Sequence, residues 1–92
     1  MAWIVEYARS VEKAMRKIDA PQRERIRDYL ERRVASLDDA RELGDPLRGQ
    51  LADLWRYRVG DYRVICEIQD ERLVVLVVRV GHRRAVYRSR PG

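Results

Sequence analysis

The chain has 92 residues, of which 46% are hydrophobic and 38% charged, so it has the size and composition of one folded domain over residues 1–92. It contains no apolar run that could cross a membrane, no signal-peptide pattern and one cysteine, from which we expect a cytoplasmic protein without internal disulfides. The net charge of +5 comes from the second half, because residues 1–46 hold 10 basic and 10 acidic side chains and residues 47–92 hold 10 and 5, which favours a nucleic-acid partner.

The first half of the chain predicts one strand and two helices. Residues 2–7 are rich in strand-forming apolar side chains, and residues 11–18 repeat apolar side chains at helical spacing. The next helix begins near Pro21, because proline is favoured at a first helical position. Its apolar face continues to Leu37, while its opposite face carries charges of both signs, which we interpret as a solvated surface.

The second half predicts a loop followed by three strands. Residues 38–49 contain two glycines and a proline and are expected to be a connecting loop. A hairpin follows, then a turn at residues 69–71 and the apolar run 73–78, which is typical of a central strand that Gly81 ends. A basic tail comes last. The element order β-α-α-β-β-β predicts an α+β fold, with two N-terminal helices packed on a mainly antiparallel four-stranded sheet.

The hairpin is the most informative stretch of the chain. Apolar and charged residues alternate on both sides of Gly60-Asp61, which predicts a two-residue turn with Val59 opposite Tyr62. One face then carries the apolar side chains, Cys66 among them as a core residue. The other face gathers Arg56, Arg58 and Arg63. Like charges placed opposite each other are destabilising, so this face is either a binding surface for a polyanion or a solvated surface that is rich in arginine.

No motif for metal or covalent catalysis is apparent. The single histidine, His82, and the single cysteine form no ligand spacing, and there is no glycine-rich phosphate loop or G-x-S-x-G motif. We therefore expect no metal and no cofactor. Arginines can bind phosphate, and a histidine or a tyrosine can move protons. Cleavage of RNA by its own 2′-hydroxyl needs no more than these groups. The simpler alternatives are that His82 is an exposed residue after a strand and that Tyr87 anchors the tail.

Three segments, residues 47–49, 54–64 and 80–88, together resemble the RelE/ParE toxin superfamily, and more closely the RelE-type mRNA interferases of type II toxin–antitoxin systems. The resemblance extends over almost the whole chain. It implies a metal-independent endoribonuclease that enters the ribosomal A site and cleaves mRNA there. It also implies a RelB-like antitoxin that neutralises the toxin in a hetero-oligomeric complex, and no association with a membrane.

The resemblance also implies roles for single residues. Arg56 and Arg58 would contact and orient the mRNA, Arg63 would stabilise the phosphate, Arg83 would act on the phosphate or the leaving group, and Tyr87 would stack on a base or assist proton transfer. Further RNA contacts are expected from Arg48, His82, Arg84 and Arg88.

One departure from the family pattern concerns the proton acceptor. The best-known RelE enzymes have lysines at the positions of Arg56 and Arg58, and arginine cannot give up its proton as a lysine of depressed pKa can. The acceptor would then be Tyr87, His82 or a group of the ribosome. Two other functions remain open from the sequence, namely a ParE-like inhibitor of DNA gyrase without nuclease activity and a non-catalytic RNA-binding or corepressor module.

Overall fold

The computed structural model describes residues 2–84, and they adopt the predicted α+β fold. The elements are β1 Ile4–Tyr7, α1 Arg9–Arg16, α2 Ala20–Asp28, the π-helical turn η1 Tyr29–Val34, the 3-10 turn η2 Ala40–Leu43, β2 Asp45–Pro46, the 3-10 turn η3 Gly49–Leu51, β3 Leu54–Val59, β4 Tyr62–Gln69 and β5 Val74–His82. The strands form one sheet in the order β1-β5-β4-β3-β2, in which β1 is parallel to β5 and the other neighbours are antiparallel.

The sheet has five strands within the described residues, one more than predicted. The additional strand, β2, lies in the segment expected to be a loop, and its Asp45 and Pro46 pair with Arg56 and Trp55 of β3. Two residues are too few to show an alternating pattern. A proline is tolerated in this strand because β2 is at the edge of the sheet.

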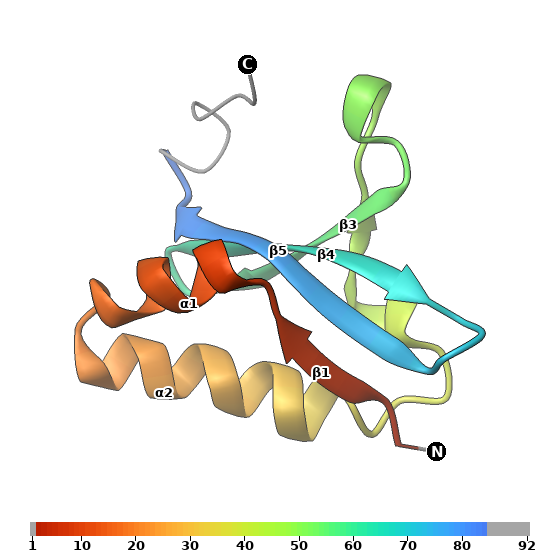
Figure 1. Ribbon diagram of the computed structural model, residues 1–92, viewed down its shortest axis with the longest axis horizontal. Coiled ribbons are helices and arrows are strands. Elements are labelled where there is room, and N and C mark those ends of the chain that lie inside the picture. The colour runs from red at the N-terminus through yellow and green to blue at the C-terminus, as the bar shows by residue number, and fades with distance from the viewer. Residues whose placement is uncertain (1, 85–92) are drawn as a thin grey trace.

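The helices cover one face of the sheet and enclose the core (Figure 1). The second helix is continuous from α2 into η1, where the amide of Ala35 bonds to the carbonyl of Leu30, five residues earlier, at 3.0 Å. The buried core contains, from the helical layer, Val11, Met15, Ile26, Leu30 and Val34 and, from the sheet, Tyr57, Val59, Val64, Cys66, Val75 and Val77. Cys66 is thus a core residue, as predicted, and burial raises the pKa of its thiol.

The hairpin has the predicted register. Val59 pairs with Tyr62, Arg58 with Arg63 and Trp55 with Cys66. Gly60 has a φ of +60°, whereas Asp61 has no positive φ, which is typical of a type II′ turn with glycine at its first central position. The turn therefore depends on a conformation that glycine adopts without steric cost.

β5 is an interior strand, between β1 and β4, as the apolar run predicted. It starts at Val74, because Leu73 belongs to the preceding turn and has a φ of 53°. It also continues beyond Gly81, which was expected to end it, since Gly81 pairs with Arg63 and His82 with Tyr62. The ladder continues past the glycine because β4 still offers Arg63 and Tyr62 as partners before the hairpin turn.

The second face of the sheet carries no helix of the described chain (Figure 1). The segment between β2 and β3, which contains η3, projects from the sheet on that side (Figure 1). Within residues 2–84, no helix has the length and apolar character needed to cross a bilayer. Tyr57, Val59 and Val64 face the core beneath the helices, so the arginines that alternate with them in β3 and β4 lie on this uncovered face.

Candidate nucleic-acid interface

Four arginines from three neighbouring strands share the uncovered face. Arg58 and Arg63 pair directly across β3 and β4, and Arg56 lies two residues before Arg58 on the same side. Arg79 of β5 pairs with Ile65, which itself pairs with Arg56, so these residues form a row across the sheet. We call the four arginines, Arg56, Arg58, Arg63 and Arg79, the arginine face. The structure thus brings together the three arginines predicted from the hairpin.

Asp45 of β2 lies against two of these arginines. Its Oδ2 accepts a hydrogen bond of 3.1 Å from Nη2 of Arg56 and lies 3.9 Å from Nε of Arg58. Register explains the contact, because Asp45 pairs with Arg56 and directly opposed residues share a face. The side chain of Arg56 is only 23% exposed, whereas that of Arg58 is 60% exposed. A carboxylate is therefore seated against two guanidinium groups of the arginine face.

Arg63 is held in place by main-chain oxygens of its own hairpin. Its Nη1 donates to the carbonyl of Gly60 at 3.0 Å and to that of Tyr62 at 2.9 Å. Its Nε and Nη2 donate no hydrogen bond to any residue among 2–84. One end of the guanidinium is thus fixed while the other remains available for an anion, which lowers the entropy that binding would cost.

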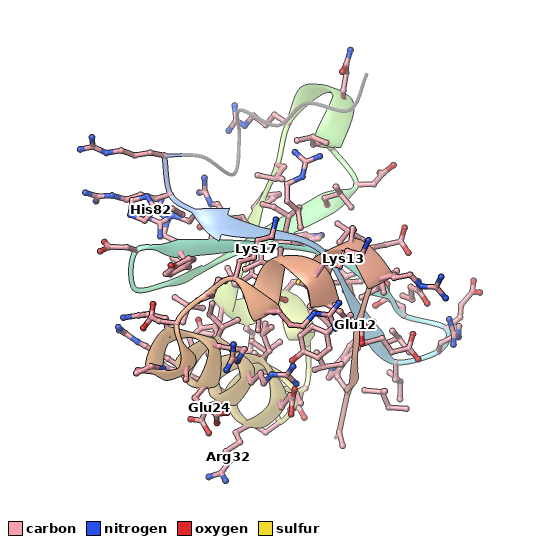
Figure 2. The ribbon with its side chains drawn as sticks, turned by 60° about the vertical axis from the view of Figure 1, so that its left-hand side comes forward. Glu12, Lys13, Lys17, Glu24, Arg32 and His82 are labelled. Atoms are coloured by element: carbon pink, nitrogen blue, oxygen red, sulfur yellow. The ribbon has the colours of Figure 1, made fainter. Side chains whose placement is uncertain are left out.

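His82 lies on the other side of the sheet from the arginine face. It pairs with Tyr62, and the two rings meet edge to face at 5.9 Å, at the end of β5 (Figure 2). Its Nδ1 accepts a hydrogen bond from the amide of Arg84 at 3.4 Å. The ring lines a pocket of about 420 Å³ together with Asp19 and Asp61. Because neighbouring residues of a strand alternate between the two faces, His82 does not lie beside the arginine face, and its expected contact with RNA stays a prediction.

The remaining predicted residues are spread around the edge of this surface. Arg83 is exposed directly after β5, and its amide donates to the carbonyl of Asp61 at 2.7 Å, which holds it beside the hairpin turn. Arg84 is also exposed. Arg48 is exposed next to η3, on the projecting segment. The structure does not describe Tyr87 and Arg88, so their expected roles lie outside the described residues.

Sequence reasoning missed two residues of this surface. Asp45 was assigned to a loop, and only the pairing of β2 with β3 brings it to Arg56. Arg79 could have been found, because it follows the apolar run 73–78 and is the first charged residue of β5. Within residues 2–84, no three side chains of His, Cys, Asp or Glu are close enough together to hold a metal ion.

A family model described as the ParE toxin of type II toxin–antitoxin systems, parDE, matches residues 5–87. The chain belongs to this family. Among similar proteins, the toxin RelG of Mycobacterium tuberculosis is 44% identical over 46 residues, and the toxin RelE of the same organism is 40% identical over 55 residues. These matches cover 50% and 60% of this chain and 53% and 57% of the two toxins, so the chain spans little more than half the length of these relatives.

Solved structures of the family share the fold. A chain of a RelBE toxin–antitoxin complex from M. tuberculosis superimposes with a TM-score of 0.82 at 23% identity, over 89% of this chain and 92% of that one. An arginine-to-alanine double mutant of E. coli RelE in the free state gives a TM-score of 0.73 at 29% identity. The match covers 92% of this chain and 87% of that one. A chain of the intact E. coli RelBE complex gives a TM-score of 0.67 at 26% identity, and the match covers 88% of this chain and 96% of that one. The resemblance to the RelE/ParE superfamily is thus confirmed.

Proposed function

We propose that this chain is the toxin of a type II toxin–antitoxin system and acts as a ribosome-dependent endoribonuclease that cleaves mRNA in the A site. The observation that carries the proposal is the arginine face. Arg58 directly opposite Arg63 weakens the isolated hairpin, and a bound polyanion would offset this repulsion. The relatives named RelE and RelG support the same branch of the family.

In the proposed reaction, the 2′-oxygen of one nucleotide attacks the adjacent phosphorus, and the bond from phosphorus to the 5′-oxygen of the next nucleotide breaks. Negative charge builds up on the phosphate oxygens as this happens. Arg56, Arg58 and Arg63 would stabilise this charge, because guanidinium groups bind phosphate oxygens in a bidentate manner. Arg83, beside the hairpin turn, would act on the same phosphate or on the leaving oxygen, which takes up a proton from solvent.

Asp45 is our candidate for the group that accepts the proton of the 2′-hydroxyl. A carboxylate can take up a proton, whereas the guanidinium groups of Arg56 and Arg58 cannot. The contacts at 3.1 and 3.9 Å put its Oδ2 next to the arginines that would hold the phosphate. His82 is directed to the other face of the sheet, so it is a weaker candidate for this role.

Partner and location follow from this function. A toxin that acts in the ribosomal A site works in the cytoplasm and requires an antitoxin to restrain it. RelB–RelE complexes are known for relatives with the same fold, including that of E. coli. We propose that a RelB-like antitoxin binds this chain in the same manner.

The alternative within the family is inhibition of DNA gyrase without nuclease activity. It is favoured by the family description, which names a ParE toxin. The arginine face and the Gly81-His82-Arg83 ending favour the nuclease instead. A supercoiling assay with purified gyrase distinguishes the two, because only a ParE-like toxin would inhibit the enzyme.

The decisive experiment uses purified ribosomes paused with a known A-site codon, and primer extension to locate any cut. We expect ribosome-dependent cleavage within that codon by the unaltered chain. Arg63→Ala and Arg83→Ala are each expected to lower the rate by about 10²-fold or more, since each removes a group that stabilises the transition state.

The matched control is Arg16→Ala, which removes the same charge from an exposed position on α1, and circular dichroism verifies that each variant is folded. Full activity of both Arg63→Ala and Arg83→Ala would contradict the assignment of the arginines. Absence of any cut on demonstrably paused ribosomes would contradict the nuclease function itself.

A further inference from the structure

A second basic surface lies at the rim of the molecule, where the second helix meets the β3–β4 turn. We call it the rim pocket. It is a hollow of about 440 Å³, and its lining consists of Arg25, Asp28, Tyr29, Arg32, Arg33, Arg58, Val59 and Gly60. Four of these residues are arginines and one is an aspartate, so the lining has a formal charge of +3. The sequence alone suggested that the charged helix face was merely solvated.

The helix brings the basic residues of the rim pocket together. Arg25, Tyr29, Arg32 and Arg33 recur at intervals of three and four residues, which places them on one side of a helix. The one carboxylate, Asp28, is engaged by Arg32 at 3.1 Å. Arg32 itself is directed away from the sheet into solvent (Figure 2). Arg25, Arg33 and Arg58 therefore determine the charge inside the hollow.

Two of these arginines have no carboxylate partner in the described part of the chain. Neither Arg25 nor Arg33 has an Asp or Glu oxygen within 4.0 Å. Arg33 instead stacks over the ring of Tyr29, with its guanidinium carbon 5.6 Å from the ring centre. Tyr29 in turn meets the buried ring of Tyr57 edge to face at 6.4 Å. This stacking orients the Arg33 guanidinium before any ligand binds.

Arg25 lies on the side of the rim pocket opposite Arg33, directly against Gly60. A Cβ at Gly60 would lie 2.8 Å from Nη1 of Arg25, so the guanidinium occupies space that a side chain at this position would take. The glycine that the hairpin turn requires thus also admits the arginine. Two unpaired guanidinium groups, one on each side of a polar hollow, are suited to a phosphate group.

We propose that the rim pocket binds a backbone phosphate of RNA, a few nucleotides away from the phosphate held at the arginine face. Arg58 supports RNA as the ligand, because it lines the rim pocket and also belongs to the arginine face. The two surfaces are therefore continuous over the end of β3. The inference rests on the proposed function in taking RNA as the ligand, and it adds a site that fixes the strand without taking part in cleavage.

The test measures binding off the ribosome, with a labelled uridine oligonucleotide whose 2′-hydroxyls are methylated so that it cannot be cut. Fluorescence anisotropy gives the affinity at several salt concentrations. For Arg25→Ala combined with Arg33→Ala we expect affinity to fall roughly tenfold. We also expect the slope of log affinity against log salt to become shallower by about 0.7, as for one lost phosphate contact on a single strand.

The matched control combines Arg9→Ala with Arg16→Ala, which removes two exposed arginines from α1, outside both surfaces. An equal loss in this control would overturn the proposal, because total charge alone would then explain the binding. The combination of Arg25→Lys with Arg33→Lys keeps the charge but lacks the planar guanidinium groups, so we expect an affinity between those of the alanine variant and the unaltered chain. Unchanged RNA binding in the alanine variant would also overturn the proposal.

The two proposals can fail separately. If the rim-pocket variant binds RNA normally while Arg56→Ala combined with Arg58→Ala does not, the rim pocket is refuted and the arginine face stands. If the oligonucleotide does not bind the unaltered chain, the rim pocket is refuted as an RNA site, whereas A-site cleavage would still support the proposed function. Normal pocket-dependent binding without cleavage would support the rim pocket and refute the nuclease.

Discussion

At the scale of single residues, the position of Asp45 changes the chemistry available to the arginine face. Arginines at the positions of the family's lysines offer no proton acceptor there, and the sequence predicts Tyr87, His82 or a group of the ribosome in its place. His82 lies on the opposite side of the sheet, whereas Oδ2 of Asp45 lies within 4.0 Å of both Arg56 and Arg58. A short edge strand thus brings a carboxylate to the site.

Asp45→Asn distinguishes a proton acceptor from a carboxylate that merely competes with RNA. If Asp45 accepts the proton, the substitution lowers the cleavage rate by about 10²-fold or more while RNA affinity stays the same or rises, because a negative charge is removed. The measurement is single-turnover cleavage on paused ribosomes at several RNA concentrations, with Asp53→Asn as the control at an exposed aspartate. Faster cleavage by Asp45→Asn would assign it the competing role.

At the scale of elements, the segment that supplies Asp45 is anchored to the sheet by Tyr57. This residue is fully buried, and its hydroxyl donates to the carbonyl of Ala40 in η2 at 2.5 Å. Burial is the main cause that raises the pKa of Tyr57, so the hydroxyl remains a donor at all physiological pH values. The bond joins η2, directly before β2, to the middle of β3.

Tyr57→Phe is expected to lower the free energy of unfolding by about 1–2 kcal/mol, because the buried carbonyl of Ala40 loses its donor. Urea denaturation followed by circular dichroism measures the change. Tyr62→Phe is the matched control, since the Tyr62 hydroxyl forms no hydrogen bond within residues 2–84. Equal stability of the two variants would show that the bond to Ala40 contributes little.

At the scale of the whole molecule, an ion pair joins segments that are far apart in the sequence. Nη1 and Nη2 of Arg41, in η2, donate to the two carboxylate oxygens of Asp70 in the β4–β5 turn, at 2.9 and 2.5 Å. Arg41 also donates to Asp39 and lies over the ring of Trp55. The bidentate bond holds η2, in the segment between the second helix and β2, against the β4–β5 turn. The hydrogen bond from Arg41 lowers the pKa of Asp70.

This pair predicts a pH dependence of stability. Because the folded-state pKa of Asp70 is lowered, the pair stabilises the fold above the unfolded-state pKa of about 3.9, and this stabilisation is lost as pH falls through the folded-state value. Asp70→Asn should therefore unfold at lower urea concentration than the unaltered chain at pH 7, and the difference should disappear in acid. Asp53→Asn serves as the control, and a difference that persists in acid would contradict the assignment.

The sequence by itself determined what depends on neighbours along the chain. The alternation around Gly60-Asp61 predicted the hairpin register and the grouping of Arg56, Arg58 and Arg63, because a period of two assigns each residue to a face. Helical spacing likewise predicted the buried face of the second helix, including Ile26, Leu30 and Val34.

Only the tertiary structure decided what depends on segments that meet from a distance. The pairing of β2 with β3 brings Asp45 to Arg56, and packing of the second helix against the hairpin turn places Arg25 over Gly60. The register of β5 against β4 pairs His82 with Tyr62, so it lies on the face opposite Arg63 although the two residues are in adjacent strands. The periodicity of the sequence predicts on which face of its own helix or strand a residue lies. Which elements meet is settled by the burial of apolar surface over the whole chain, and this leaves no local pattern in the sequence.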